Sequence, residues 1–333
     1  MDLIQFQRLF DKEPRYRLGQ AKRALFHDLI KNWQEAVVLP LSLREKLNKE
    51  CPIEIPAKTF VSKDRNTIKA LLTLKDDLKI ETVLMRHKDE RNTICVSSQV
   101  GCSLNCSFCA TGKMGFKRNL EVSEIVEQVL FFARYLEQIG EKVTNIVFMG
   151  MGEPFLNYQN VIGAIKILND KEGFNLGARH FSISTVGIVE GIEKLAKEKL
   201  QINLAVSLHA PNDELRSKLM PIDKKYPIKK ILNSIDDYIK KTRRRVMFEY
   251  IMINNLNDSE EHAQILARLM KKPLYFVNLI SYNPTGVFKS SPSLRIKKFK
   301  EILEKEGVMV TQRYRFGQGI KAACGQLALS AVY

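Results

Sequence analysis

The chain has 333 residues, of which 45% are hydrophobic and 27% are charged. This is the composition of a soluble globular protein with one large or two ordinary domains, and no apolar run approaches the roughly 20 residues of a membrane helix, so a membrane partner is not expected. The formal net charge of +16 favours a polyanionic partner such as a nucleic acid. Residues 1–8 lack the basic and apolar segments of a secretory leader, so we expect a reducing, cytoplasmic location.

The first 90 residues predict a small accessory domain. Amphipathic helices are expected at residues 3–10 and 18–29, and short strands at residues 59–60, 67–74 and 80–85. Aromatic and basic side chains mix in Pro14-Arg-Tyr-Arg17 and Lys22-Arg23, as in a nucleic-acid-binding module, although a packed helical cap explains the same pattern. We expect residues 1–90 to form an accessory domain that ends in a strand-rich linker.

From residue 93 onward, strand and helix patterns alternate six times. The expected strands cover residues 93–97, 145–149, 180–184, 202–207, 246–252 and 275–280, and the expected helices cover residues 122–136, 158–168, 188–196, 228–240, 259–269 and 293–304. Six such units predict an α/β fold with a parallel sheet, but periodicity alone does not separate an open doubly wound sheet from a partial barrel. In both folds, reactive groups belong at the carboxyl ends of the strands.

Three cysteines follow the first of these strands with the spacing CxxxCxxC: Cys102, Cys106 and Cys109. Three thiolates on a short loop can bind three irons of a [4Fe-4S] cluster and leave the fourth iron open to a small molecule. A structural zinc site is disfavoured, because it needs four Cys or His ligands and no histidine lies between Arg91 and Ala178. Structural disulfides are disfavoured by the expected reducing location. The spacing is typical of radical S-adenosylmethionine (SAM) enzymes, in which SAM binds the open iron.

Motifs around the cysteines narrow this resemblance to one family. They are Cys95–Cys102, Gly115–Leu120, Met149–Pro154, Ser182–Thr185, Ser207–Asp213, Tyr282–Pro284 and Ala323–Gln326. Together they resemble the RlmN family, which methylates carbon 2 of adenine in 23S rRNA and in tRNA. The resemblance implies that residues 91–333 form a partial (βα)6 radical SAM barrel, that the accessory domain binds RNA, and that a flavodoxin-type donor supplies electrons. We also expect a monomer.

The same resemblance implies a SAM pocket at the strand ends. Its residues are Gly152, Glu153, Ser184, Ser207, Leu208, His209 and Asn283. Glycine lets the backbone approach a ligand closely, and a carboxylate can accept hydrogen bonds from the SAM amino group, so the turn at Gly152 and Glu153 suits this role.

Two further cysteines have catalytic roles by resemblance. Carbon 2 of adenine is unactivated, so a radical is needed to methylate it. Cys324 is implied to take a methyl group from one SAM, and a second SAM supplies the radical that adds this carbon to the RNA. Cys95 is implied to release the product by forming a disulfide with Cys324, and Glu81 to remove the ring proton. Each turnover then consumes two SAM molecules and external reductant.

Two other functions compete with this prediction. A related resistance enzyme methylates carbon 8 of adenine with the same cysteines, and Pro154 favours carbon 2 because that relative tends to have alanine there. A non-catalytic iron–sulfur RNA-binding protein would explain the cluster and the charge, but not the pair Cys95 and Cys324.

Clustered basic residues are the candidates for RNA contacts. The first choice is Arg243-Arg-Arg245, and the alternatives are Lys117, Arg118, Arg313 and Arg315. The family often has Arg-Gly-x-Asp-Ile before the alanine-cysteine motif, whereas this chain has Phe316-Gly-Gln-Gly-Ile320, so we expect its RNA contacts near Cys324 to differ.

Overall fold

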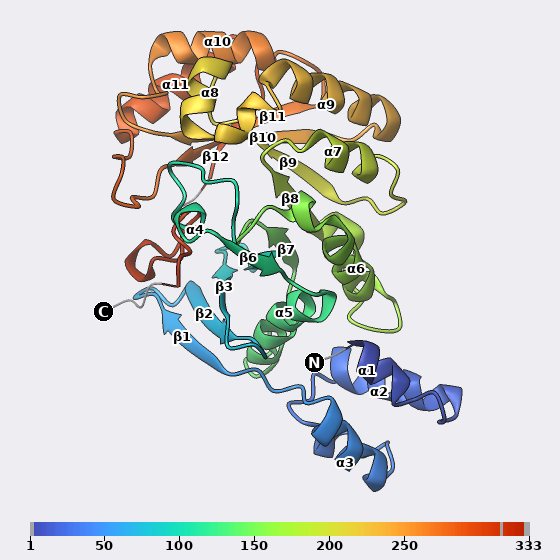
Figure 1. Ribbon diagram of the computed structural model, residues 1–333. Helices are drawn as coiled ribbons and strands as arrows, with labels where there is room; N and C mark the ends of the chain where they lie inside the picture. The colour runs from blue at the N-terminus through green and yellow to red at the C-terminus, as the bar shows by residue number, and fades with distance from the viewer. Residues whose placement is uncertain (1–2, 314–315, 330–333) are drawn as a thin grey trace.

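The computed structural model describes residues 3–313 and 316–329 (Figure 1). In these residues one sheet has the strand order β1 (Ala57–Val61), β2 (Thr67–Thr73), β3 (Lys79–Arg86), β4 (Asn92–Cys95), β7 (Asn145–Phe148), β8 (Phe181–Thr185), β9 (Asn203–Ser207), β10 (Val246–Met252), β11 (Tyr275–Ser281) and β12 (Val310–Gln312). Neighbouring strands from β4 to β12 are parallel, and the end strands β1 and β12 do not pair with each other within the described residues. The six βα units of the expected partial barrel are confirmed.

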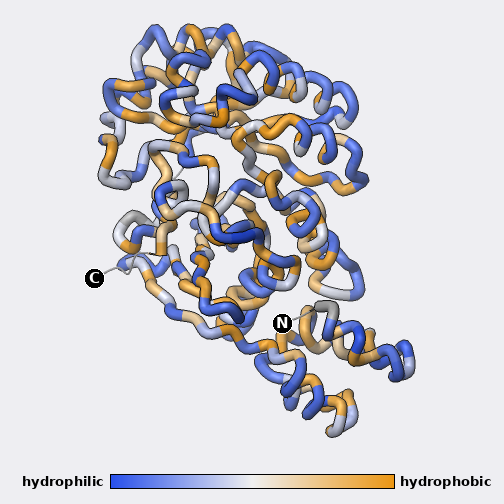
Figure 2. Tube along the Cα trace, in the orientation of Figure 1, coloured by the Kyte–Doolittle hydropathy of each residue, from blue (hydrophilic) through white to orange (hydrophobic). Residues whose placement is uncertain are grey.

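Six helices connect the parallel strands: α5 (Val122–Glu137), α6 (Tyr158–Asn169), α7 (Val189–Leu195), α9 (Ile228–Thr242), α10 (Glu260–Met270) and α11 (Ser293–Lys305). They lie along one side of the curved sheet, and hydrophobic and hydrophilic residues alternate along them (Figures 1 and 2). Each matches its expected range within a few residues, because its apolar positions repeat with the helical period. None of the described helices is long and apolar enough to cross a membrane.

Short elements at the strand ends were not predicted from the sequence. They are a hairpin of β5 (Gln99–Gly101) and β6 (Phe116–Asn119), and the helices α4 (Ala110–Lys113) and α8 (Asp213–Leu219). Each is too short to show a clear period of hydrophobic residues. These elements shape the end of the barrel where the site lies.

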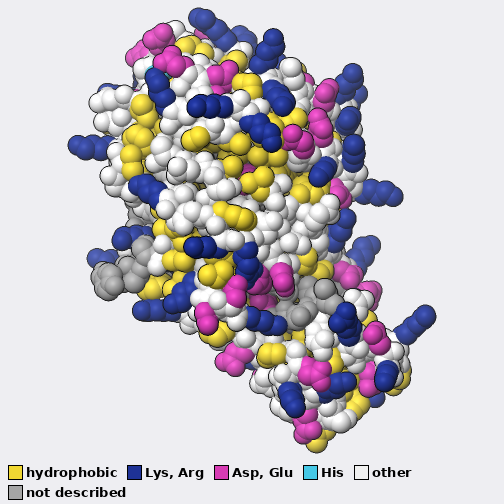
Figure 3. All heavy atoms as spheres, in the orientation of Figure 1, with side chains coloured by type: hydrophobic (Ala, Val, Ile, Leu, Met, Phe, Trp, Pro, Cys, Tyr) yellow, Lys and Arg dark blue, Asp and Glu magenta, His cyan; other side chains and the backbone are white. Residues whose placement is uncertain are grey.

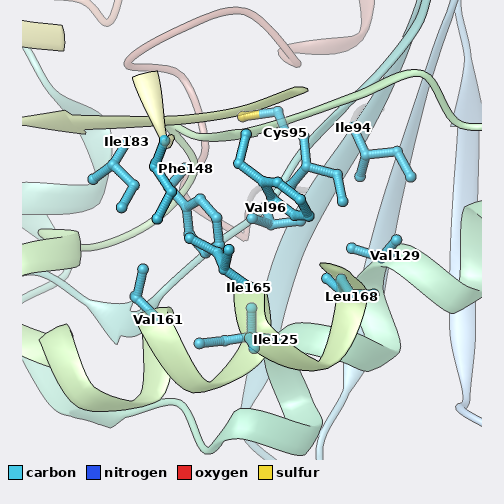
Figure 4. Close-up of a cluster of buried hydrophobic side chains, with 14 of the residues drawn as sticks. Ile94, Cys95, Val96, Ile125, Val129, Phe148, Val161, Ile165, Leu168 and Ile183 are labelled. Carbon is cyan, nitrogen blue, oxygen red and sulfur yellow. The ribbon is translucent and has the colours of Figure 1, made fainter. Parts of the chain in front are cut away.

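The core between the sheet and its helices explains which side chains of β4 face the site. Ile94 and Val96 are fully buried and point toward the apolar faces of α5 and α6, whereas the sulfur of Cys95 points to the other side of the strand (Figure 4). Successive side chains of a strand alternate between faces, so the strand that anchors the core also turns Cys95 toward the barrel interior.

The N-terminal region has its own helices and shares the sheet. α1 (Leu3–Arg8), α2 (Arg15–Phe26) and α3 (Leu41–Glu50) surround the buried Trp33, whose indole Nε1 donates a hydrogen bond to the Cys51 carbonyl (2.8 Å). β1, β2 and β3 then form an antiparallel extension of the barrel sheet, in which Val83 of β3 pairs with Cys95 of β4. The assignment of residues 1–90 to a separate accessory domain stays a prediction.

Candidate active site

The cluster loop, defined as Cys102–Cys109, is fixed at both of its ends by backbone hydrogen bonds. The Cys102 amide donates to the Gly115 carbonyl (2.9 Å), and the Cys109 amide donates to the Cys106 carbonyl (3.0 Å). The loop is also tied to the end of α8, because the Ser107 amide donates to the Leu219 carbonyl. All three cysteines consequently line one cavity at the carboxyl ends of the strands.

This cavity fits a metal cluster rather than a single metal ion. It encloses about 920 Å³, counting its open mouth, and among the described residues no three His, Cys, Asp or Glu side chains converge closely enough to hold one ion. Burial, reinforced by repulsion from the other thiolates, raises the pKa of Cys102 to about 11 and raises that of Cys106 further. Thiols gathered in this way need a positive group before they all ionise, and an iron–sulfur cluster supplies one.

The turn after β7 packs directly against the segment that leads into the cluster loop. A Cβ atom on Gly150 would lie 2.7 Å from the Val96 carbonyl oxygen, and one on Gly152 would lie 2.5 Å from the Gln99 Cβ. Gly152 also has a φ of 96°, which side-chain-bearing residues rarely adopt. Both glycines are therefore required for the close approach of these two segments.

Glu153 follows this turn and is buried in the cavity wall. Its two carboxylate oxygens accept hydrogen bonds from the amides of Phe155 (3.1 Å) and Val186 (2.9 Å). Burial nevertheless raises the pKa of Glu153 to about 7, because the amides offset only part of the cost of desolvating the charge. The carboxylate lines the same cavity as the three cysteines, as expected for a group that binds an amino group of SAM.

Three polar groups from neighbouring strands complete this wall. The Ser184 hydroxyl donates to Glu249 Oε2 (2.6 Å) and lies 3.4 Å from the Ser207 hydroxyl. Glu249, at the position of β10 that pairs with Ser207, was not identified from the sequence. A single acidic residue inside an otherwise apolar strand was the only signal that could have found it.

His209 lines the cavity as a neutral imidazole. Its Nδ1 accepts a hydrogen bond from the Ile251 amide (3.2 Å), and burial lowers its pKa to about 3. Its ring meets the Phe108 ring of the cluster loop edge-on, with centroids 5.0 Å apart. The adjacent Leu208 is fully buried and does not line the cavity.

Cys95 and Cys324, which lie 229 positions apart by their numbers in the sequence, line a second, smaller cavity together. Asn283 lies in this cavity rather than in the larger one, and its Nδ2 donates to the Cys324 carbonyl (3.3 Å). Burial, with the charge of Cys324 nearby, raises the pKa of Cys95 to about 12, so Cys95 is a thiol at neutral pH. Cys324 also lines the larger cavity. Of the two thiols, Cys324 is therefore the one that also faces the cavity of the cluster loop.

Arg313 lines both cavities, and its side chain is 20% exposed. Its Nη1 lies 3.5 Å from Glu249 Oε1 and 3.2 Å from the Met149 sulfur. The neighbouring Cys324 and Glu249 charges raise its pKa. Arg313 directly follows β12, which ends at Gln312, and lies in the barrel beside Cys324, so its role as a candidate RNA contact stays a prediction.

Glu81 lies on the same face of the sheet as Cys95, two residues from the partner of Cys95 on β3. It is 1% exposed and forms a buried ion pair with Lys69 of β2 (Nζ to Oε1, 2.7 Å). It lines neither of the two cavities.

Comparison with known proteins agrees with this geometry. Residues 96–266 match the family described as the Radical SAM superfamily. A probable dual-specificity RNA methyltransferase RlmN of Dictyoglomus thermophilum is 48% identical over 317 residues, which cover 95% of this chain and 91% of that protein. A ribosomal RNA large subunit methyltransferase N of Nitrosopumilus maritimus is 48% identical over 96% of this chain and 93% of that protein. The chain belongs to the RlmN family.

A solved structure extends the similarity to nearly the whole fold of the chain. A radical SAM methyltransferase from Sphaerobacter thermophilus matches with a TM-score of 0.93 and 45% identity over 97% of this chain and 96% of that chain. The present chain is accordingly a SAM-dependent methyltransferase of the radical SAM type. Its family uses a [4Fe-4S] cluster and SAM.

Proposed function

We propose that this enzyme methylates carbon 2 of an adenine in 23S rRNA and in tRNA through an S-methylcysteine at Cys324. The observation that carries the proposal is the position of Cys324, which lines both the cavity of the cluster loop and the cavity of Cys95. A methyl carrier must meet SAM on one side and a resolving thiol on the other, and the position of Cys324 in both cavities supports this role. Peptide mass spectrometry of the purified protein tests this directly, since Cys324 should carry one extra methyl group.

The cysteines of the cluster loop, Cys102, Cys106 and Cys109, would hold the [4Fe-4S] cluster, and Glu153, Ser184 and His209 would line the SAM site beside it. When bound, the cluster supplies the electron that cleaves SAM to methionine and a 5′-deoxyadenosyl radical. Glu153 would orient the amino group of SAM, and His209 would offer its Nε2 hydrogen, since Nδ1 already accepts a backbone hydrogen bond.

The protein's thiols would act in two stages. First, the Cys324 thiolate attacks the methyl carbon of one SAM, which forms S-methylcysteine, breaks the bond from that carbon to the sulfonium sulfur and releases S-adenosylhomocysteine. The adenosyl radical from a second SAM then removes a hydrogen atom from that methyl group, and the resulting carbon radical bonds to carbon 2 of adenine.

Release of the product would use Cys95. The adduct loses one electron, returned to the redox partner, and the carbon 2 proton. Glu81 is the proposed base, and it would have to release its bonds to Lys69 and Ala328 to reach this proton, because it lines neither cavity in this structure. Cys95 loses its thiol proton and attacks the Cys324 sulfur, the carbon–sulfur bond breaks, and the new methyl group takes up a proton. A Cys95–Cys324 disulfide remains, which an external reductant such as a flavodoxin-type donor reduces. Two SAM molecules are used per methyl group.

RNA is expected to bind at the cluster end of the barrel. Arg243, Arg244 and Arg245 precede β10, and Arg244 bonds to Asn203 at the start of β9. At about 3.3 Å per residue, they lie about 20 Å from the strand ends that form the site. This placement argues against the first choice made from the sequence.

Of the alternative basic residues in the described part of the chain, Lys117 is the one that is exposed. Arg118 is held by Asp76 and Glu124, both at 2.7 Å, and Arg313 lies within the barrel, 3.5 Å from Glu249. Arg315 lies outside the described residues. Lys117 is exposed on β6, beside the cluster loop, and Lys113 at the end of α4 is exposed as well. Other lysines and arginines are scattered across the viewed surface (Figure 3).

Replacement of Lys113 and Lys117 by glutamine should weaken RNA binding and flatten its salt dependence. Each phosphate contact that is lost should reduce the slope of log affinity against log salt by about 0.7 to 0.9, because fewer counterions are released. Filter binding at several salt concentrations measures the slope. The matched control, in which Arg243, Arg244 and Arg245 become glutamine, should keep the parental slope. If the slope became flatter only in the variant of Arg243, Arg244 and Arg245, these arginines and not the two lysines would be the RNA contacts.

SAM affinity should fall as the pH is lowered through about 7. The carboxylate form of Glu153 attracts the SAM amino group, and burial raises the pKa of Glu153 to about 7, so protonation removes the attraction below that pH. The loss should approach about tenfold per pH unit when only the ionised form binds. Titration of SAM into cluster-loaded protein between pH 5.5 and 7.5 measures it. Glu153→Gln should bind weakly at every pH, and an unchanged profile in that variant would exclude Glu153 as the titrating group.

A further inference from the structure

The Cys324 segment, defined as Lys321–Ala328, is attached to the protein on two opposite sides. On one side lies α4, next to the cluster loop: the Ala110 amide donates to the Gly325 carbonyl (2.8 Å), and the Thr111 hydroxyl donates to the Leu327 carbonyl (2.6 Å). On the other side lie β2 and β3, which reach the segment with charged side chains. Figure 1 shows the C-terminal chain between α4 and the β1–β2 hairpin.

The charged side chains are Lys69 and Glu81, and each bonds both to the other and to the Cys324 segment. Glu81 Oε1 pairs with Lys69 Nζ (2.7 Å), while Glu81 Oε2 accepts the backbone hydrogen bond of Ala328 (2.9 Å). Lys69 Nζ also donates to the Lys321 carbonyl (3.5 Å). The ion pair thus contacts the segment three residues before Cys324 and four residues after it.

Burial of the two charges has a free-energy cost, because both lose their contact with water. Lys69 and Glu81 are 0% and 1% exposed. A buried ion pair commonly contributes no more stability than apolar residues of similar size, because desolvation opposes the attraction between its charges. The pair does fix the positions of the groups that it binds, because charge-assisted hydrogen bonds are strong and have a defined geometry. Here those groups are the two ends of the segment that carries Cys324.

We propose that Lys69 and Glu81 are positioning residues, and that their buried ion pair fixes the Cys324 segment so that Cys324 faces both cavities. The proposal rests on the proposed function of Cys324 as methyl carrier. It gives Lys69 a role in catalysis although Lys69 touches neither cavity. It also gives Glu81 a role in the first methyl transfer, before any ring proton is removed.

The test compares Lys69→Met, Glu81→Gln and the double variant Lys69→Met/Glu81→Met in anaerobically reconstituted protein. The double variant leaves no unpaired buried charge, so it guards against simple misfolding. Iron content and the cluster spectrum should stay normal in all three. The rate at which Cys324 gains a methyl group from SAM should fall about tenfold to a hundredfold, as for small displacements of a reacting group. Deuterium exchange at the Ala328 amide should become faster.

Two controls separate the positioning role from a nonspecific effect of losing a lysine. Lys79→Met removes an exposed lysine from the same strand as Glu81 and should methylate Cys324 at the parental rate. Lys69→Arg keeps the charge and should recover part of the rate. Normal methylation of Cys324 in Lys69→Met and in the double variant would overturn the proposal, as would Glu81→Gln protein that methylates Cys324 normally and stalls only after RNA addition. Absence of methyl-Cys324 in the parental protein would instead refute the proposed function.

Discussion

In the Cys95→Ala variant, RNA is expected to stay covalently attached to Cys324. The methyl carbon can still be transferred to Cys324 and joined to adenine, because Cys324 and the cluster loop are unchanged. The adduct then has no second thiol to attack its sulfur, since Cys95 is the other cysteine that lines the smaller cavity. The product should appear on denaturing gels as a shifted, nuclease-sensitive band, and turnover should fall to the level of a single event or less.

Two further cysteine variants make this result specific. Cys324→Ala should contain a normal cluster but show neither methylcysteine nor adduct. Cys51→Ala removes a buried cysteine from the N-terminal helical region and should turn over normally, which controls for loss of a buried thiol. Normal turnover of Cys95→Ala without an adduct would exclude the resolving role of Cys95.

Replacement of any one of Cys102, Cys106 and Cys109 by alanine should abolish the cluster and, with it, all SAM cleavage. Two thiolates cannot hold a [4Fe-4S] cluster whose fourth iron must stay open to SAM. Iron and sulfide analysis after anaerobic reconstitution should fall from about four of each per chain to near zero, and the visible absorption of the cluster should be lost.

The parental protein and Cys324→Ala are the matched controls for this loss, because both keep the three cysteines of the cluster loop. Retention of a normal cluster in one of the three alanine variants would show that another residue is the ligand. Among the described residues, Glu153 is one candidate, since its carboxylate shares the cavity with the three cysteines.

The parallel part of the fold followed from the sequence because its signals are local. β10 covers Val246–Met252 as expected, and α9 begins at the expected Ile228. Cys102, Glu153 and Ser184 share one cavity, as their motifs at the strand ends predicted. The reason is that the carboxyl ends of parallel strands lie at the same end of the sheet.

The parts that the sequence did not predict depend on contacts between distant segments. Glu249 and Arg313 approach each other across 64 positions, and Lys69 reaches the carbonyl of Lys321 across 252 positions. No periodicity encodes such pairs. The sequence also does not distinguish an arginine that faces solvent from one that, like Arg313, lies beside two thiols. Only the fold distinguishes these two positions.

The central claim, methylation of adenine carbon 2 in RNA, is tested most directly by mass spectrometry of nucleosides. Both 23S rRNA and tRNA from cells with and without the gene should be digested and compared, with Cys324→Ala as the inactive control. We expect 2-methyladenosine in both RNAs only when the active protein is present. Accumulation of 8-methyladenosine, or no change in any methyladenosine, would contradict the account.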